Sequence, residues 1–373
     1  LLLWLGSPAI VWWIGQPRVR DEAQLTIEQT IFLRKISRKT WAFFETFVGP
    51  EDRWLPPDNY QEYHGAAVAH RTSPTNIGMA LLANLSAYDF GYLPAGQLIE
   101  RTTYTFDTMQ ALARYRGHFY NWYDTKSLKP LHPAYVSTVD SGNLAGHLLT
   151  LRSGLLALTD DKIFSANWFH GFHDTLGILL DAAASTHSDQ LASLQKDIAS
   201  ARGSPPATPV LAWQHLNQLI KHAEVFAERI EVAASQELLH TASAQMPAGK
   251  KRYTETEGYP EIDEDSTHHP TLDHASAVIS ETTSGSDAVW WARALVRQCH
   301  TARDELTFLA PWLALPAAPS EFDDNFDIVT VPTLRELAGF DGELLSTIEQ
   351  QLSVPLVNVT TSAGREWLHE YKR

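Results

Sequence analysis

Apolar residues along this chain recur mostly at three- and four-residue spacing, the period of an amphipathic helix. The clearest run lies between Leu25 and Val48, where Ile27, Ile31 and Trp41 share this spacing. Period-two alternation is scarce, so few strands are expected. The helical period predicts further helices over Pro74–Phe90, Gly96–Arg116, Asp140–Leu158, Lys162–Ala184, Val210–Leu239, Asp287–Leu313 and Asp341–Leu352. The chain is therefore expected to be all-α.

Short polar side chains mark the expected starts of several of these helices. Ser73 is suited to be an N-cap, because Pro74 follows it and fits the first helical turn. Asp140 or Ser141 is predicted to cap the helix that ends near Leu158, and Asp160 the helix after it.

The predicted helices form an even series joined alternately by short turns and long polar loops. Such a series is typical of a helical toroid, the (α/α) barrel, rather than of a simple bundle. A complete toroid of six helix pairs needs about twelve helices. Fewer are predicted here, so an incomplete (α/α) toroid-like barrel is expected.

The first residues, Leu1–Ile14, form an uncharged apolar run that ends with two Trp and is followed by Arg18 and Arg20. This run is too short to span a bilayer alone, since about 20 apolar residues are needed. It also lacks the basic start of a signal peptide. The aromatic pair and the basic flank fit the cytoplasmic end of a transmembrane helix. The alternative is an amphipathic or buried helix of a soluble protein.

Two stretches interrupt the helical pattern. Thr241–Asp287 combines a basic cluster, an acidic cluster and a Ser/Thr-rich segment, which indicates a solvated insertion. Leu315–Thr333 is a second irregular stretch. The expected organisation is the end of a transmembrane helix over 1–16, the first barrel helices with long polar loops over 17–240, a polar insertion over 241–286 and further helices of the same domain, truncated, over 287–373.

Composition narrows the possible functions. The 373 residues are 44% hydrophobic, which is enough for a large buried core, and carry a formal net charge of −15. A protein that binds nucleic acid would present a basic face instead, so no nucleic-acid partner is expected. The single cysteine, Cys299, excludes an intrachain disulfide and is interpreted as a small buried apolar residue.

Three polar segments carry the strongest functional signal: Trp54–Glu62, Arg71–Gly78 and Ser137–Gly146. Each combines Asp, Asn, Ser or Thr with Gly or Pro and opens or precedes a predicted helix. Polar side chains on rigid loops beside Trp and Tyr suit a sugar, because hydroxyl groups need hydrogen bonds and the C–H face of a pyranose stacks on aromatic rings. The alternative for each segment is a turn with a helix cap.

Glycosidic chemistry would require a pair of carboxylates, one as proton donor and the other as nucleophile or base. Asp140 is a weak catalytic candidate, and Glu62, Asp58 or Asp124 could be its partner. Two other motifs are discounted. Asp323–Asp327 resembles a magnesium–diphosphate motif but lies in an irregular linker, and His170 with His173 has no second cluster to complete a metal site. No metal is expected.

Six phrases together resemble the middle, glucoamylase-like region of bacterial cyclic β-1,2-glucan synthases: Arg38–Phe47, Trp54–Glu62, Arg71–Gly78, Gly117–Thr125, Tyr135–Gly146 and Trp290–Leu295. The resemblance implies an (α/α) barrel that closes the glucan ring by transglycosylation. It also implies a membrane-embedded transferase part upstream that uses UDP-glucose, and a phosphorylase-like part downstream. No cofactor is implied for the ring-closing step.

By this resemblance the chain is a fragment of a protein of the bacterial inner membrane, with this domain facing the cytoplasm. Its partners would be a β-1,2-glucan chain, the other domains of the polypeptide and the membrane. The catalytic carboxylates are expected beyond Arg373, so the isolated chain is expected to be inactive. The implied substrate contacts are Trp54, Asp58, Asn59, Gln61, Arg71, Thr75, Asn76, Trp122, Tyr123, Asp140, Ser141 and Asn143. The alternatives are a non-catalytic glycan-binding helical scaffold and an endo-β-1,2-glucanase-like hydrolase fragment.

Overall fold

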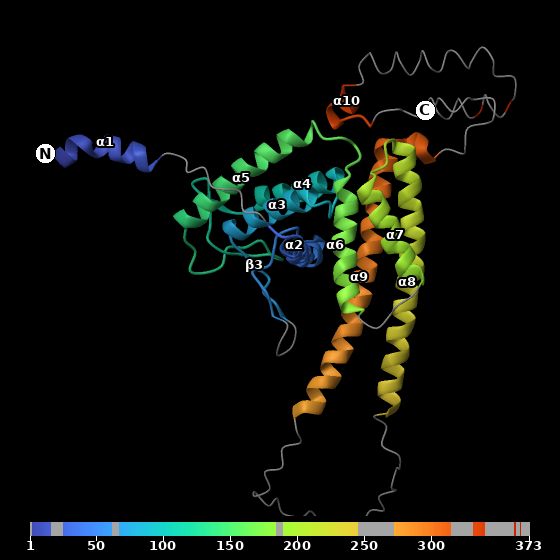
Figure 1. The fold of residues 1–373 in the computed structure, drawn as a ribbon. Helices are drawn as coiled ribbons and strands as arrows, with labels where there is room; N and C mark the ends of the chain where they lie inside the picture. Colours follow the sequence, from blue (N-terminus) through green and yellow to red (C-terminus); the bar gives the residue numbers. More distant parts are fainter. Residues whose placement is uncertain are drawn as a thin grey trace, which may run out of the picture. The chain divides into compact units, whose positions relative to one another are not determined.

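A computed structural model describes residues 2–15, 25–61, 67–183, 189–244, 272–314 and 331–339, together with positions 362 and 366 (Figure 1). The chain divides into two units, Leu1–Arg34 and Lys35–Arg373. The predicted helix Asp341–Leu352, the motif Asp323–Asp327 and the candidate Glu62 lie outside the described residues.

The first unit holds α1 (Leu2–Ile14) and the beginning of α2 (Ile27–Phe47). A capping box opens α2: the Thr26 hydroxyl accepts from the Gln29 amide at 3.2 Å, and the Gln29 side chain accepts from the Thr26 amide at 2.9 Å. The predicted helix at the start of the chain is confirmed. In the part of the chain that the structure describes, no helix is long and apolar enough to cross a bilayer.

In the second unit, α3 (Pro74–Asp89) packs against both α4 (Ala95–Ala111) and α5 (Thr138–Leu158). Ser73 caps α3 by accepting from the Asn76 amide at 3.2 Å, and Pro74 fills the first turn, as predicted. The buried apolar residues of this part include Leu55, Ile77, Leu81, Leu98, Tyr123, Leu144 and Leu151.

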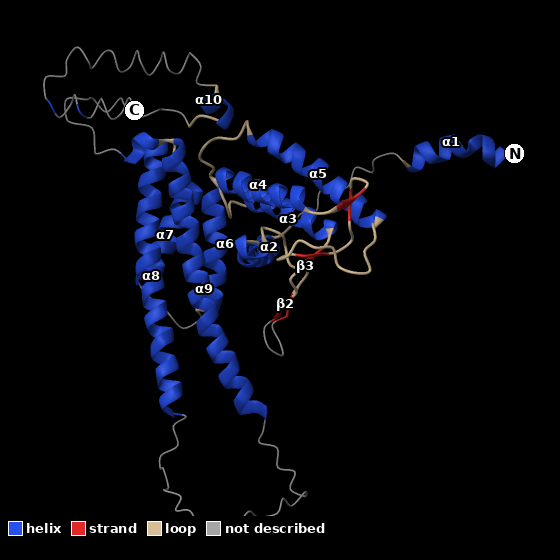
Figure 2. Cartoon of the chain, turned by 180° about the vertical axis from the view of Figure 1, so that it is seen from behind, coloured by secondary structure: helices blue, strands red, loops and turns tan. Residues whose placement is uncertain are grey.

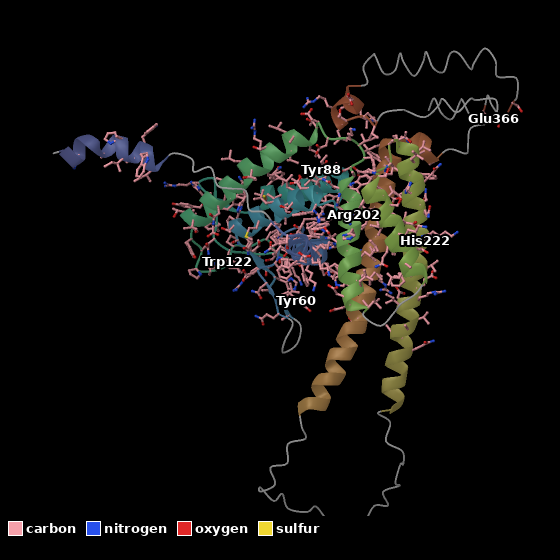
Figure 3. The ribbon with its side chains drawn as sticks, in the orientation of Figure 1. Tyr60, Tyr88, Trp122, Arg202, His222 and Glu366 are labelled. Carbon is pink, nitrogen blue, oxygen red and sulfur yellow. The ribbon has the colours of Figure 1, made fainter. Side chains whose placement is uncertain are left out.

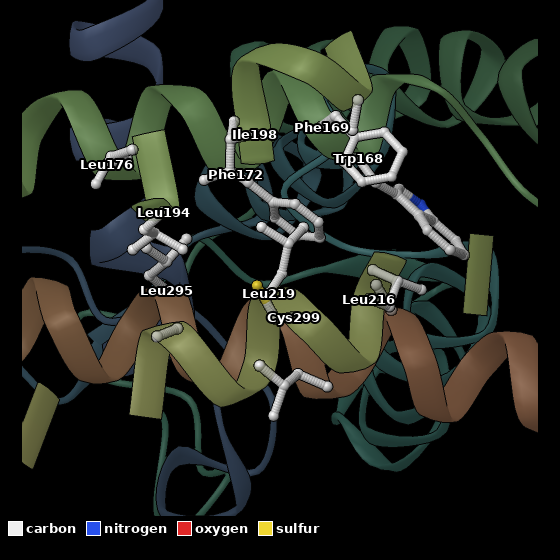
Figure 4. Close-up of a cluster of buried hydrophobic side chains, with 14 of the residues drawn as sticks. Trp168, Phe169, Phe172, Leu176, Leu194, Ile198, Leu216, Leu219, Leu295 and Cys299 are labelled. Atoms are coloured by element: carbon white, nitrogen blue, oxygen red, sulfur yellow. The ribbon is translucent and has the colours of Figure 1, made fainter. Parts of the chain in front are cut away.

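The same unit contains α6 (Asn167–Ala182), α7 (Asp189–Gly203), α8 (Pro209–Ala244) and α9 (Leu272–Leu309), which lie side by side (Figures 1 and 2). Their facing sides form the largest apolar core, part of which is shown in Figure 4. Cys299 is fully buried in this core, which confirms its prediction as a small apolar residue, and burial raises the pKa of its thiol.

The remaining elements are short. They are two 3₁₀ helices, η1 (Pro50–Asp52) and η2 (Pro311–Ala314), a short helix α10 (Leu334–Ala338), and the strands β1 (Tyr60–Gln61), β2 (Ala67–Val68), β3 (Arg71–Thr72), β4 (Arg114–Tyr115), β5 (His118–Phe119) and β6 (Tyr123–Asp124). The strands pair antiparallel as β1 with β2, β3 with β6 and β4 with β5. In the β3–β6 ladder Arg71 lies opposite Asp124 and Thr72 opposite Tyr123.

Buried polar contacts join α2 to the helices around the large core. The Arg38 side chain is almost fully buried, donates from Nε to the Thr175 hydroxyl at 2.8 Å and pairs with Glu45 at 3.0 Å. Burial lowers the pKa of its guanidinium. Since Arg38 and Thr175 are both buried, the hydrogen bond between them ties α2 to α6.

Most predicted helices are confirmed, with four differences. The helix predicted over Gly96–Arg116 ends at Ala111, after which the chain turns into the β4–β5 hairpin. The helix α7 was not predicted, and α9 begins well before Asp287. The predicted insertion is therefore shorter: α8 extends to Ala244 and α9 starts at Leu272, so helix replaces loop at both of its ends.

Two predicted N-caps are wrong. Neither Asp140 nor Ser141 caps α5; the hydroxyl of Ser137 accepts from the Asp140 amide at 3.1 Å, and both residues lie inside the first turn. Asp160 does not cap α6, which begins seven residues later at Asn167 without a side-chain cap. Asp160 instead accepts from Arg335 at 2.6 Å. A mostly helical fold is confirmed, but the described residues do not show a closed barrel.

Candidate functional site

The β3–β6 ladder brings the second polar segment to the Trp122 ring. Alternate residues of a strand lie on the same face, so Arg71, opposite Asp124, is a diagonal neighbour of Trp122. The Arg71 guanidinium lies 5.1 Å from the centroid of the Trp122 ring, which can be located in Figure 3. The same guanidinium donates to Asp58 Oδ2 from Nε at 3.2 Å and from Nη2 at 2.9 Å.

Asp58 collects further donors from two of the polar segments. Its Oδ2 accepts from Asn59 at 3.1 Å, and its Oδ1 lies 3.4 Å from Nδ2 of Asn76 in the first turn of α3. The Asp58 amide donates to the carbonyl of Ala69 at 3.1 Å, which ties this loop to the connection between β2 and β3. The first and second polar segments therefore meet at one carboxylate.

The third segment joins through α5. The Thr75 hydroxyl donates to Asp140 Oδ1 at 2.6 Å, and Asn143 donates to the Thr75 hydroxyl at 3.2 Å. The two helices approach closely here because residue 78 is glycine: a Cβ at Gly78 would collide with the imidazole of His147. Gly78 thus serves the packing that lets Thr75 reach Asp140.

Asn121 connects these contacts to Trp122. In the amide orientation that satisfies both of its groups, Asn121 donates to Asp140 Oδ2 at 2.8 Å and accepts from Trp122 Nε1 at 2.6 Å and from the Tyr135 hydroxyl at 2.8 Å. We call the connected set the Asp58–Asp140 network. Its members are Asp58, Asn59, Arg71, Thr75, Asn76, Asn121, Trp122, Tyr135, Asp140 and Asn143.

The network is polar, partly exposed and fixed by its own hydrogen bonds. Arg71 and Asn143 are exposed, whereas Asp58, Thr75 and Asp140 are half-buried. Both oxygens of Asp140 accept hydrogen bonds, from Thr75 and from Asn121. Amides, a guanidinium and carboxylates held in one place can bind the hydroxyl groups of a sugar, and the Trp122 ring offers a stacking surface.

Tyr123, a predicted substrate contact, and Asp124, a weak catalytic candidate, have other roles in the structure. Tyr123 is fully buried; its hydroxyl donates to the Ala113 carbonyl and accepts from the Tyr120 amide, each at 2.7 Å. The structure therefore contradicts its predicted stacking on a glucose unit. Asp124 caps its own turn, accepting from the Ser127 amide at 2.7 Å, and these bonds hold the pKa of the Asp124 carboxyl below its usual range. Asp124 is thus a poor proton donor at neutral pH.

Three further predicted substrate contacts lie outside the Asp58–Asp140 network. Trp54 has a left-handed backbone, with φ of 62°, and its ring stacks on Tyr104 of α4 at 4.8 Å. Gln61 is an exposed residue of β1. The Ser141 hydroxyl donates to the Ser137 carbonyl of its own helix at 2.8 Å. Their predicted roles as substrate contacts remain predictions.

Sequence reasoning did not single out Asn121 or Tyr135. Both lie within phrases that carry the family resemblance, and Asn121 directly precedes Trp122. The available signal for Asn121 was an amide side chain next to an aromatic residue in a loop.

Among the residues that the structure describes, no group of three or more His, Cys, Asp and Glu side chains could hold a metal ion.

Comparison with known proteins shows what one region of this chain is similar to. No model of a known protein family matches it. Over 153 residues, 41% of its length, it is 46% identical to the cyclic beta-(1,2)-glucan synthase NdvB of Rhizobium meliloti (strain 1021). The match spans 5% of the length of that relative. The resemblance predicted from the six phrases is therefore confirmed as a partial match: a region of this chain is homologous to a region of a cyclic β-1,2-glucan synthase.

Proposed function

We propose that this chain contributes glucan subsites to the domain that closes the ring of a cyclic β-1,2-glucan. The observation that supports this proposal most strongly is the position of Arg71. It joins the Asp58 carboxylate to the Trp122 ring, and so places a hydrogen-bonding group beside a stacking surface. A glucose unit needs both, because its edge carries hydroxyl groups and its face carries C–H bonds.

The chemistry of the carboxylates favours a binding role over a catalytic one. Asp140 accepts hydrogen bonds from Thr75 and Asn121, and Asp58 is paired with the guanidinium of Arg71. Both carboxylates are therefore already engaged in holding neighbouring side chains in place. The proposal therefore leaves the catalytic carboxylates to another part of the enzyme.

The wider architecture follows the same proposal. The described helices would form part of an (α/α) barrel, and α1 would be the end of a membrane helix that anchors this domain on the cytoplasmic side of a bacterial inner membrane. A transferase part that uses UDP-glucose would supply the linear glucan. The subsites themselves would need no cofactor, since the network binds through side chains alone.

A calorimetric titration of the chain tests the proposed binding. Linear β-1,2-glucan is the ligand, and linear oligomers of cellulose and starch are the competitors. Saturable binding of the β-1,2-glucan that neither competitor displaces is the expected result. Absence of binding, or equal binding of all three glucans, would contradict the proposal.

Both oxygens of Asp140 already accept hydrogen bonds from neighbouring side chains. This observation also favours a second candidate function, a non-catalytic glycan-binding scaffold. Mass spectrometry of linear β-1,2-glucan incubated with the chain separates the candidates. Cyclic products would show that the chain is a complete transglycosylase, and shorter linear products that it is a hydrolase. Unchanged glucan, together with binding, is the result expected for subsites alone.

A further inference from the structure

A buried carboxylate lies directly behind the β3–β6 ladder. Asp52, in η1, is 5% exposed and accepts a hydrogen bond from the Thr125 hydroxyl. Its Oδ1 also lies 2.8 Å from Nδ1 of His70. Because a carboxylate can only accept, the His70 ring must carry its proton on Nδ1.

His70 and Thr125 are the next opposed pair beyond the ladder. The Thr125 amide donates to the His70 carbonyl at 3.1 Å, which continues the register in which Arg71 faces Asp124. Successive side chains point to opposite faces of a strand. His70 and Thr125 therefore point inward to Asp52, whereas Arg71 points to the face that carries Trp122.

We propose that Asp52 is a positioning residue for the glucan subsite: by joining His70 to Thr125 it holds β3 and β6 in the register that places Arg71 against Asp58 and Trp122. This inference rests on the proposed function only where it concerns glucan binding. The placement of the Arg71 side chain by Asp52 does not depend on that function.

The geometry gives Asp52 this role for two reasons. The ladder has only two residues in each strand, and so short a pairing is marginal without side-chain support. In addition, Asp52 lies six residues before Asp58 in one continuous loop. The same carboxylate therefore anchors the loop that carries the acceptor, Asp58, and the ladder that carries its donor, Arg71.

The first test reads the position of Arg71 without any glucan. The Nε–H proton of Arg71 donates to Asp58, so its ¹H–¹⁵N signal should be protected from exchange in the wild-type chain and absent in Arg71→Lys. His70→Ala and Thr125→Val each remove one of the two hydrogen bonds to Asp52, and each should abolish the protected Arg71 signal. Circular dichroism confirms that each variant keeps its helices.

Conservative variants separate a hydrogen-bonding role from a packing role. His70→Asn places an amide donor near the position of Nδ1, and Thr125→Ser keeps the hydroxyl. Both should retain the protected Arg71 signal. If the signal persists in His70→Ala and Thr125→Val, or disappears equally in the conservative variants, Asp52 does not position Arg71, whatever the chain binds.

A double-mutant cycle tests the binding consequence with linear β-1,2-glucan as the probe. In the wild-type background Arg71→Ala should weaken binding by about tenfold, but by less than about twofold in the His70→Ala background, because Arg71 is then already displaced. Equal losses in both backgrounds would overturn the positioning role. If the wild-type chain binds no glucan, the proposed function fails, and the signal of Arg71 still decides the role of Asp52.

Discussion

The Thr75 hydroxyl lies 2.6 Å from Oδ1 of Asp140, although 65 residues separate the two in the sequence. This bond links the first turn of α3 to the first turn of α5 and brings two of the polar segments together. Thr75→Val removes the donor and leaves a half-buried carboxylate oxygen without it. We expect a loss of about 1–2 kcal/mol in the free energy of unfolding, measured by denaturant titration.

Thr75→Ser is the matched control for this substitution, because serine keeps the hydroxyl. Its free energy of unfolding should stay within about 0.5 kcal/mol of the wild-type value. Equal losses in the valine and serine variants would mean that the methyl group of Thr75, rather than its bond to Asp140, stabilises this contact.

The corrected N-cap of α5 gives a second prediction. Ser137→Ala removes the oxygen that accepts from the Asp140 amide and should cost about 1 kcal/mol of stability. Ser141→Ala is expected to cost less than about 0.5 kcal/mol, because that hydroxyl only donates back to its own helix. The thermal midpoints of the two variants check the order. A larger loss of stability for Ser141→Ala would indicate that Ser141, one of the two residues predicted from the sequence, caps α5.

Two glycines in neighbouring helices should respond in opposite directions to alanine. Gly78→Ala places a methyl group against His147 and should destabilise the chain by about 1–3 kcal/mol. A Cβ at Gly142, in α5, meets no neighbouring atom. Gly142→Ala should therefore stabilise the chain by about 0.5–1 kcal/mol through helix propensity alone. Equal effects at both positions, measured by denaturant titration, would contradict the close approach of α3 and α5.

The carboxyl of Glu305 in α9 gives a prediction for pH. Burial raises its pKa, and the hydrogen bond from the Gly96 amide at 2.7 Å opposes this only in part. The native state therefore holds the proton to higher pH than the unfolded chain does, so this group costs stability as pH rises through the native pKa. Glu305→Gln keeps an acceptor for Gly96 and should be at least as stable as the wild type at pH 8.

The advantage of Glu305→Gln should shrink as pH falls through the raised native pKa of Glu305 and vanish below the ordinary pKa of a glutamic acid, because both chains then carry a neutral side chain there. Thermal unfolding of both chains across this range measures the difference. An advantage that stays constant with pH would show that titration of Glu305 is not its cause.

The sequence predicted the helices well because their apolar residues repeat at the helical period, as in α2, α3 and α8. It missed α7, whose residues are mixed in polarity, and the ends of α8 and α9, whose polar composition favoured a loop. For α7, whose buried residues include Leu191, Leu194 and Ile198, packing against α6 and α8 decides the structure more than local propensity does.

The candidate site was predicted in its segments but not in its internal contacts. Asp58, Arg71 and Asp140 were selected by residue type, and the structure brings them into one network. The burial of Tyr123 depends on the β3–β6 register, which two-residue strands do not reveal in sequence. The same register brings His70 and Thr125 together at the Asp52 carboxylate. No sequence pattern around Asp52 predicts this contact.

A comparison of two arginines tests the central claim most directly. Arg71 and Arg297 each pair with a carboxylate and lie over a Trp ring, at 5.1 Å and 5.5 Å, and about half of each side chain is exposed. Calorimetric titration with linear β-1,2-glucan should show about tenfold weaker binding for Arg71→Ala and unchanged binding for Arg297→Ala. Equal binding by the two variants would contradict a glucan subsite at the Asp58–Asp140 network.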